Sequence, residues 1–336
     1  MPEIENEKQV RLPRIGITIG DAAGIGPEVV IKAITDPEIL SRCMPIIIGD
    51  SEHLEIAAAA LGLPFPDDLK IVDLANLPKP VRYGTEYAEC GRAAGQFIEK
   101  AVELCLSGHI DAIATAPISK RSLSLGGYNF PGHTEFLAEL TGTKEFAMSF
   151  FGGHLRVVLV STHVPLRRAI ELVKREPLVK LIRFADREFS RLLGRKVKIA
   201  VAGLNPHASE AGMFGSEEME EISPAIRECS ESFGIDVSGP YSPDTIFLRG
   251  SRGEFDAVVA CYHDQATIAV KSLAFGSAVN VTLGLPLIRT SVDHGTAFDI
   301  AGKGIADESS MKAAITVAAE LAHVKELGTV DRAANS

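Results

Sequence analysis

Short apolar segments alternate with helical patterns along most of the chain. Seven segments consist almost entirely of aliphatic and small residues, and each is followed by a turn or loop with polar, glycine or proline residues. These predicted strands cover residues 15–19, 45–48, 112–115, 156–161, 197–202, 257–262 and 278–282. Strands that are apolar on both faces are typical of a largely parallel sheet buried between helices. The pattern therefore predicts an α/β fold.

Helical patterns fill several of the intervening segments. They follow GDAAGIGPE, cover residues 93–106, include FLAEL at 136–140, and occupy 311–324 near the end of the chain. A chain of 336 residues is long enough for two domains of roughly 150 residues each. Because no Gly/Ser-rich linker is present, we expect elements of the fold itself to join the domains. The last helical segment is then expected to return to the first domain.

Composition excludes several classes of protein. Hydrophobic residues make up 46% and charged residues 23%, and the net charge is −10 without a long basic run. An acidic chain of this kind is unsuited to bind nucleic acid or an anionic membrane. No apolar stretch approaches the roughly 18 residues of a spanning helix, and the first residues lack the apolar core of a secretory signal. Five cysteines without a CxxC pair indicate reduced thiols, and we expect a cytoplasmic protein.

Three predicted strands each end at, or a few residues before, a histidine: His163, His207 and His263. Ligands of open α/β sheets bind at the carboxyl ends of the strands. Three imidazoles with one open position are typical of a catalytic zinc site. Three unrelated loop histidines with structural hydrogen bonds are the alternative, and the spacing alone leaves both interpretations open.

Two carboxylates are candidates for chemistry beside these histidines. Asp264 follows His263 directly, where it could orient the imidazole or act as a base. Asp244, in PDTIF, is the second candidate, with a turn or helix cap as its alternative.

Further polar residues could bind an anion. His133 and Thr134 precede the helical FLAEL segment, and free backbone amides at a helix N-terminus attract anions. A capping threonine is the alternative. Lys271, Asn280 and Arg289 lie in one stretch and could bind phosphate and carboxylate groups. A surface lysine and an ion-paired arginine would look the same in the sequence.

Two segments are rich in glycine. GDAAGIGPE, at 20–28, lacks both the GK[ST] ending of a Walker A loop and the GxGxxG spacing, so we assign no nucleotide to it. The segment 293–304, DHGTAFDIAGKG, places small residues among donors and acceptors, where the backbone could approach a ligand closely. An ordinary glycine-rich connection is the alternative for the second segment.

Together the motifs resemble one family over roughly residues 14–325. They are GDAAGIGPE, TAPISK, GHTEFLAELTG, STHVPL, GLNPHASEAGMFGSEE, GPYSPDTIF, YHDQ and VNVTLGLPLIRTSVDHGTAFDIAGKGIAD. In this order they resemble the 4-hydroxythreonine-4-phosphate dehydrogenase family. The resemblance implies two α/β/α domains with a cleft between them, as in isocitrate and isopropylmalate dehydrogenases. The first would comprise 14–150 and 296–336, the second would comprise 151–295 and carry the metal ligands, and 1–13 would be a polar extension.

The resemblance also implies roles for individual residues. The ligands of a divalent metal would be His163, His207 and His263. Zinc is expected there, with cobalt, manganese or magnesium as alternatives. The substrate contacts would be His133, Thr134, Lys271, Asn280 and Arg289, and the catalytic carboxylates Asp244 and Asp264. Because 293–307 resembles an adenosine-binding loop, NAD or NADP is expected to contact His294, Gly295, Thr296, Asp299 and Gly302.

The reaction implied is oxidation of the 3-hydroxyl of 4-phosphooxy-L-threonine, followed by decarboxylation to 3-amino-2-oxopropyl phosphate in pyridoxal 5′-phosphate synthesis. The family is homodimeric, with an active site that uses residues of both subunits. The chain departs from the family pattern at two places: Ala22 replaces a usual proline, and residues 266–269 lack the usual glycine and proline. The second departure lies beside Lys271 and bears on the substrate. Dehydrogenases of D-threonate or D-erythronate 4-phosphate, or of aromatic dihydrodiols, share the pattern. A non-catalytic phosphometabolite-binding protein and a metal-dependent phosphatase or lyase are the alternatives from other classes.

Overall fold

The computed structural model describes residues 11–66, 68–274 and 276–334. Within this part of the chain, eleven strands form one sheet in the order β3-β2-β1-β4-β11-β10-β5-β6-β9-β7-β8. The strands are β1 (Arg14–Thr18), β2 (Met44–Gly49), β3 (Lys70–Asp73), β4 (Ala112–Thr115), β5 (Ala147–Gly152), β6 (Leu155–Leu159), β7 (Ile199–Ala202), β8 (Val237–Tyr241), β9 (Ala257–Ala260), β10 (Val279–Leu283) and β11 (Arg289–Ser291). The α/β fold class predicted from the sequence is confirmed.

Each of the seven predicted strands overlaps a strand of the structure, and four others were not predicted. Of these four, β3 and β8 lie at the two edges of the sheet and are partly exposed, so they lack a continuous apolar run. The short β11 begins with an arginine, and β5 begins with two half-buried residues. An apolar pattern detects strands that are buried on both faces and misses strands of these kinds.

The sheet has two parallel blocks and an antiparallel centre. In one block β3, β2, β1, β4 and β11 are parallel, and in the other β6, β9, β7 and β8 are parallel. Between the blocks, β10 pairs antiparallel with β11 and β5, and β5 pairs antiparallel with β6. The prediction of a largely parallel sheet is therefore confirmed, and the antiparallel pairings are confined to the centre, where the hairpins β5–β6 and β10–β11 reverse the chain.

Helices connect and cover the strands. They are α1 (Gly26–Ile34), α2 (Pro37–Arg42), α3 (Ser51–Leu61), α4 (Ala88–Leu106), α5 (Lys120–Leu125), α6 (His133–Leu140), α7 (Leu166–Leu172), α8 (Arg175–Leu193), α9 (Ser223–Phe233), α10 (Pro243–Ser251), α11 (His263–Leu273) and α12 (Ser309–Ala334). A short 3₁₀ segment, η1 (Pro206–Glu210), and a π-helical turn, η2 (Glu218–Ile222), follow β7. None of the described helices is both long and apolar enough to cross a membrane.

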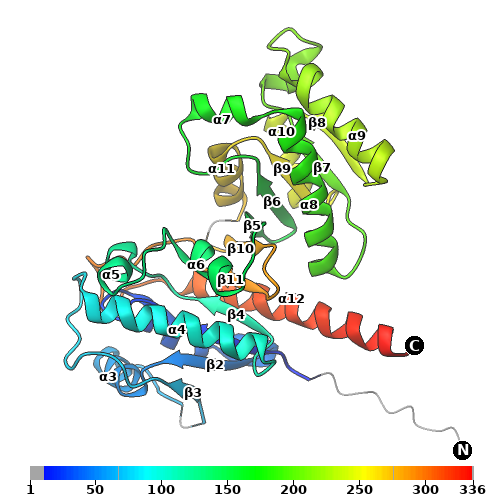
Figure 1. The fold of residues 1–336 in the computed structure, drawn as a ribbon. Coiled ribbons are helices and arrows are strands. Elements are labelled where there is room, and N and C mark those ends of the chain that lie inside the picture. Colours follow the sequence, from blue (N-terminus) through cyan, green and yellow to red (C-terminus); the bar gives the residue numbers. More distant parts are fainter. Residues whose placement is uncertain (1–10, 67, 275, 335–336) are drawn as a thin grey trace, which may run out of the picture.

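The ribbon forms two lobes (Figure 1). The lower lobe holds β1 to β4 with α1 to α6, and the upper lobe holds β6 to β9 with α7 to α11. The last helix, α12, contacts β1, β4, β10 and β11. The domain boundaries expected from the sequence remain a prediction, because residue 150 lies inside β5 and the sheet continues through both lobes.

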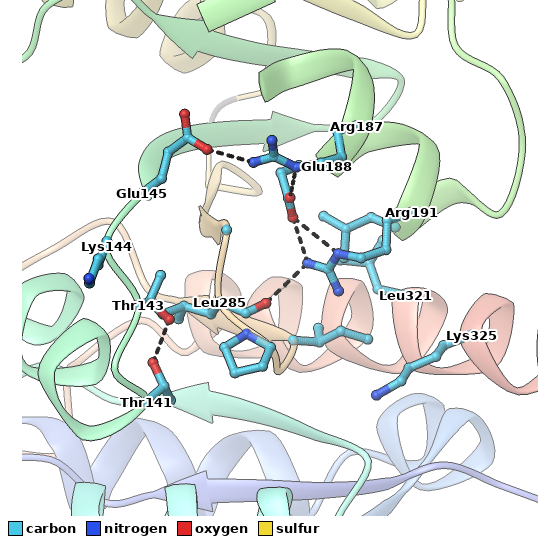
Figure 2. A pocket seen from close by; sticks show the side chains of 14 residues that line it. Thr141, Thr143, Lys144, Glu145, Arg187, Glu188, Arg191, Leu285, Leu321 and Lys325 are labelled. Carbon is cyan, nitrogen blue, oxygen red and sulfur yellow. Dashed lines mark hydrogen bonds and ion pairs between the residues drawn. The ribbon is translucent and has the colours of Figure 1, made fainter. Parts of the chain in front are cut away.

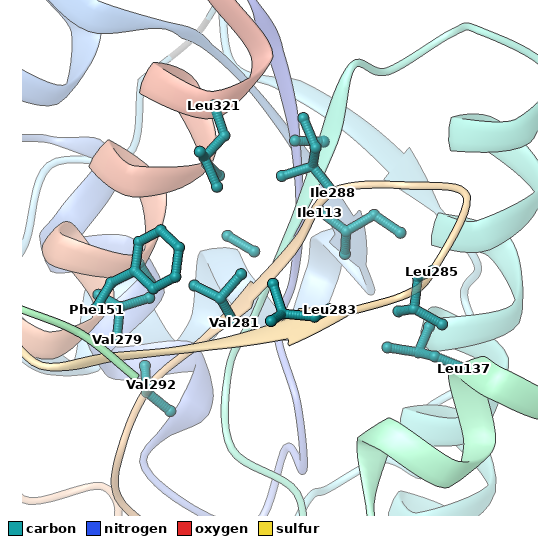
Figure 3. Packing of buried hydrophobic residues seen from close by; sticks show 14 of the residues in the cluster. Ile113, Leu137, Phe151, Val279, Val281, Leu283, Leu285, Ile288, Val292 and Leu321 are labelled. Carbon is teal, nitrogen blue, oxygen red and sulfur yellow. The ribbon is translucent and has the colours of Figure 1, made fainter. Parts of the chain in front are cut away.

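A buried apolar cluster surrounds the central strand β10 (Figure 3). Val279, Val281 and Leu283 of β10 pack in one core with Ile113 of β4 and Leu321 of α12. Burial of each such side chain stabilises the fold by roughly 1.5–3 kcal/mol. This core fixes the position of β4, β10 and β11, whose ends carry the candidate site.

Candidate active site

A cavity of about 200 Å³ lies beside the carboxyl ends of β4 and β11. The loop 117–120 after β4, the start of α6, strand β10 and residues 289–294 all contribute to its wall. Six residues predicted from the sequence line it: His133, Thr134, His163, Asn280, Arg289 and His294. They come from segments far apart in the chain, and the topology brings them to one place.

Four of these residues have a buried polar atom without a hydrogen-bond partner. The atoms are His133 Nε2, Asn280 Oδ1, Arg289 Nε and His294 Nε2. A buried polar atom that lacks a partner costs roughly 1–3 kcal/mol, so such atoms are rare in native proteins. Four of them around one cavity indicate that a polar ligand completes their hydrogen bonds.

Arg289 is 2% exposed, so its charged guanidinium is buried. Its guanidinium donates to Thr115 Oγ1 at 2.8 Å and to Thr282 Oγ1 at 3.1 Å. Among the described residues no carboxylate forms an ion pair with it, and burial lowers the pKa of Arg289 to about 9. A buried cation that only hydroxyl groups contact attracts an anionic ligand.

His133 is the first residue of α6, and Gly132 is the N-cap, so the predicted position at a helix N-terminus is confirmed. Burial, and secondly the charge of Arg289, hold the pKa of His133 well below its ordinary value. The imidazole is therefore neutral at pH 7. Together with the free amides of the helix start, it offers hydrogen bonds to an anion without adding a charge.

Two of the three predicted metal ligands lie side by side. The ring centroids of His163 and His263 are 5.6 Å apart. Asp264 Oδ1 lies 2.8 Å from Nδ1 of His263, which orients this ring and leaves Nε2 for a metal. His207 does not join them: across the described residues, one chain holds no group of three His, Cys, Asp or Glu that could bind a metal ion.

The segment that carries His207 has an unusual backbone. Five consecutive residues, 207–211, have positive φ angles between 45° and 64°, although none is glycine. Buried Glu218 holds the preceding residues, because its Oε1 accepts from the backbone N–H of Leu204 at 2.8 Å and of Asn205 at 2.7 Å. Strain of this kind persists where the surroundings enforce it, often at functional sites. Sequence reasoning assigned no role to Glu218, although GSEE belongs to the GLNPH motif.

Three other predicted residues lie outside the lining of this cavity. Lys271 pairs with Asp293 at 2.9 Å. Asp244, near the start of α10, is exposed and accepts from Ser242 Oγ at 2.6 Å, as a turn residue would. Asp264 is 72% exposed. The catalytic roles expected for Asp244 and Asp264 remain predictions.

The two glycine-rich segments pack against each other. Ile25 N–H donates to the carbonyl of Thr296 at 3.0 Å, and a Cβ on Gly24 would lie only 2.8 Å from that oxygen. Gly302, with φ +74°, lies against the ring of Tyr83, which a Cβ would approach to 2.8 Å. The expected cofactor loop is therefore fixed close to the first strand-to-helix turn, while Gly295 and Asp299 face solvent.

Sequence reasoning missed two further residues at strand ends. Lys120, the last residue of TAPISK, lines the cavity and has no ion pair within the part of the chain that the structure describes. Gln265 links two strands, because it donates to the carbonyl of Gly203 at 2.8 Å and accepts from Cys261 N–H at 2.7 Å. Their positions a few residues after β4 and β9 are the signal that could have identified them.

A larger cavity, of about 660 Å³, lies elsewhere and is lined by none of the predicted residues (Figure 2). Several of its charged groups are paired: Glu188 accepts from Arg187 and Arg191, and Arg191 also donates to the carbonyl of Leu285. None of the buried polar atoms without a partner belongs to a residue that lines it. The smaller cavity is therefore the stronger candidate site.

Comparison with known proteins identifies the family of this chain. Residues 31–318 match the family model described as pyridoxal phosphate biosynthetic protein PdxA. The chain is 46% identical to D-threonate 4-phosphate dehydrogenase of Cupriavidus necator, over 93% of this chain and 98% of that protein. It is 44% identical to 4-hydroxythreonine-4-phosphate dehydrogenase of Geobacter metallireducens, over 94% and 97%.

A solved structure shows the same fold. The 4-hydroxythreonine-4-phosphate dehydrogenase of Klebsiella pneumoniae superposes with a TM-score of 0.85 at 39% identity, covering 92% of this chain and 99% of that one. Dehydrogenases of this family use NAD(P) and a divalent metal. The family model covers most of the chain, and the relatives match over nearly their whole length. The chain thus belongs to the PdxA family and is an NAD(P)-dependent dehydrogenase.

Proposed function

We propose that the chain oxidises 4-phosphooxy-L-threonine at its 3-hydroxyl with NAD(P) and a divalent metal. The oxidised acid then loses carbon dioxide to give 3-amino-2-oxopropyl phosphate, a step toward pyridoxal 5′-phosphate. The observation that carries this proposal is the set of four buried polar atoms without partners around one cavity. They are donors and acceptors suited to a small ligand with several oxygen atoms.

The charges around the cavity favour a phosphorylated acid. Arg289 and Lys120 supply two cations, and Glu135 is the one carboxylate among the lining residues. A phosphate or carboxylate group can form charge-assisted hydrogen bonds with the guanidinium and with the start of α6. The amide oxygen of Asn280 accepts a hydrogen bond from a hydroxyl or ammonium group of the substrate.

The metal would be held by His163 and His263 of one chain, with His207 as the third ligand. The fit of the first two rests on their 5.6 Å separation and on the carboxylate of Asp264 at His263 Nδ1. Because His207 stands apart within one chain, we propose that a second copy supplies it in a homodimer. A divalent metal in such a site favours the deprotonated form of a substrate hydroxyl.

The remaining groups orient the substrate and move the proton. The neutral imidazole of His133 and the cationic guanidinium of Arg289 bind a phosphate or carboxylate group of the acid. His163 lines the same cavity, so the proposed metal would lie beside the substrate. The hydroxyl proton passes to a base, for which Asp264 and Asp244 are the candidates. The carbon-bound hydrogen leaves with its electron pair to NAD(P). Loss of carbon dioxide then follows from the 3-oxo acid.

D-threonate 4-phosphate is the second candidate substrate. The relative of that name from Cupriavidus necator is 46% identical, against 44% for the relative from Geobacter metallireducens. The two substrates differ at C2, where one carries an ammonium group and the other a hydroxyl. A hydroxyl would suit a cavity with two cations and one carboxylate at least as well.

The experiment is NAD(P)H formation by the metal-reconstituted protein on both substrates and on D-erythronate 4-phosphate. A preference for 4-phosphooxy-L-threonine that His207→Ala abolishes supports the proposal. A preference for either sugar-acid phosphate replaces it with the second candidate and moves the enzyme to sugar-acid catabolism. Absence of activity on all three would overturn the proposed substrate class.

A further inference from the structure

Helix α1 carries a buried ion pair, and neither of its residues lines the candidate active site. Glu28 is 3% exposed, and its Oε1 lies 2.9 Å from Nζ of Lys32, one helical turn further along. The other carboxylate oxygen, Oε2, is buried and has no hydrogen-bond partner in the described part of the chain. Because desolvation offsets the attraction between buried charges, such a pair adds little net stability. Its contacts outside α1 are therefore the more informative.

The ion pair binds the backbone of a segment far away in the sequence. Glu28 Oε1 also accepts from the backbone N–H of Ala306 at 2.8 Å. Lys32 Nζ donates to the carbonyl of Gly304 at 3.1 Å and to that of Ala306 at 2.7 Å. Hydrogen bonds with one charged partner are roughly twice as strong as neutral ones. Three of them thus fix two small residues whose side chains offer little for packing.

The segment fixed in this way is the end of the loop 293–307, where NAD(P) is expected from the sequence. The turn before α1 binds the same loop nearer its start, because Ile25 N–H donates to the carbonyl of Thr296 at 3.0 Å. The beginning of α1 therefore holds the loop on both sides of the arc 297–303. The expected cofactor contacts within this arc are Asp299 and Gly302.

The start of the loop fits a polar ligand and is held by other contacts. His294 Nε2 is buried without a partner at the candidate active site, and a Cβ on Gly295 would meet open space, so a ligand can approach the backbone there. Asp293 pairs with Lys271 at 2.9 Å, and its N–H donates to Ser310 Oγ at 3.2 Å. Removal of the α1 ion pair would therefore leave the acid-binding end of the loop in place.

We propose that Glu28 and Lys32 are positioning residues for NAD(P), which hold the loop 293–307 in the conformation that accepts the nucleotide. They act through the backbone of residues 304–306. A loop that is already ordered loses less conformational entropy when its ligand binds, so this preorganisation raises the affinity. The proposal rests on the proposed function only in that the loop 293–307 binds the nucleotide.

The test is a calorimetric titration of the metal-loaded protein with NADH, 4-phosphooxy-L-threonine and D-threonate 4-phosphate. The double variant Glu28→Gln/Lys32→Met keeps the size of both side chains, leaves no buried charge alone and removes the bonds from Lys32 to the loop. We expect it to bind NADH about tenfold more weakly and the acids as the wild type does. Glu176→Gln/Lys180→Met changes an exposed pair with the same spacing on α8 and is the matched control.

Amide hydrogen exchange gives a second readout that needs no variant. In the wild type without nucleotide, the amide of Ala306 should exchange as slowly as those of β1, because Glu28 holds it. Rapid exchange there, wild-type NADH affinity in the double variant, or an equal loss of NADH and acid affinity overturns the positioning role. Normal NADH binding by the wild type, with loss in the double variant and no binding of any phosphorylated acid, overturns the proposed function alone.

Discussion

At the scale of single residues, the candidate site contains charges and hydrogen-bonding groups that the fold alone does not satisfy. Arg289 is buried beside the hydroxyls of Thr115 and Thr282, and its Nε has no partner. An uncompensated buried charge destabilises the folded state. We propose that the arginine serves ligand binding at the expense of stability.

Arg289→Met should separate these two effects. We expect kcat/KM to fall by about 100-fold, because the anion loses its buried partner. The free energy of unfolding should rise by about 1–3 kcal/mol, since an apolar side chain of similar length replaces an isolated cation. Enzyme assays and urea titrations measure the two quantities. Arg289→Lys keeps the charge and should show no stabilisation; a less stable Arg289→Met protein would contradict the argument.

The pH dependence of stability should contain a contribution from His133. Burial holds its pKa in the folded state below the ordinary value of 6.5, so between these two values only the unfolded chain binds the proton. Above pH 6.5 His133 causes no loss of stability. As the pH falls below 6.5, the free energy of unfolding decreases by up to about 1.4 kcal/mol per pH unit. In urea titrations from pH 7.5 to 5.5, His133→Gln should lose less stability than the wild type. The exposed His109→Gln should behave like the wild type.

At the scale of elements, apolar runs were sufficient to predict the strands buried on both faces and the carboxyl ends at which His163, His207 and His263 stand. They were not sufficient for the edge strands β3 and β8, or for β11, which begins with an arginine.

The element around His207 depends on Glu218. Glu218→Gln keeps the size of the side chain but replaces one carboxylate oxygen by an NH₂ donor. The replaced atom is either Oε2, which accepts from Asn205 Nδ2, or Oε1, which accepts from the backbone amides of Leu204 and Asn205. We expect zinc affinity to fall by about 10- to 100-fold, as for other groups that orient metal ligands. A titration against a competing chelator measures this. The exposed neighbour Glu220→Gln is the control, and equal affinities for the two variants would exclude a positioning role for Glu218.

At the scale of the whole molecule, the sequence predicted the α/β class and the family correctly, and the structure brings six predicted residues to one cavity. A single chain does not bring three imidazoles together, because among the described residues His207 lies apart from His163 and His263. In the proposed homodimer the second copy supplies the third imidazole, and neither apolar periodicity nor motif spacing encodes such an assembly.

Mixed dimers test whether a second copy completes the site. His207→Ala and His163→Ala should each be inactive alone. Coexpressed with different tags, they should recover about a quarter of the wild-type activity, because half of the dimers are mixed and each has one intact site. The pair His163→Ala and His263→Ala should recover none, since both ligands come from the same subunit. Recovery by the second pair, or by neither, would contradict a shared site.

The antiparallel centre of the sheet also determines how the lobes can move. β10 and β5 are hydrogen-bonded to each other. β10 is also hydrogen-bonded to β11 of one parallel block, and β5 to β6 of the other. A change of angle between the lobes must therefore twist a hydrogen-bonded ribbon, and the restoring force grows with the displacement. We expect this motion to be a bending of the ribbon about one rest position. Ligands would then change the mean distance between the lobes gradually. The degree of closure would increase with the strength of the attraction that a ligand exerts between the two lobes.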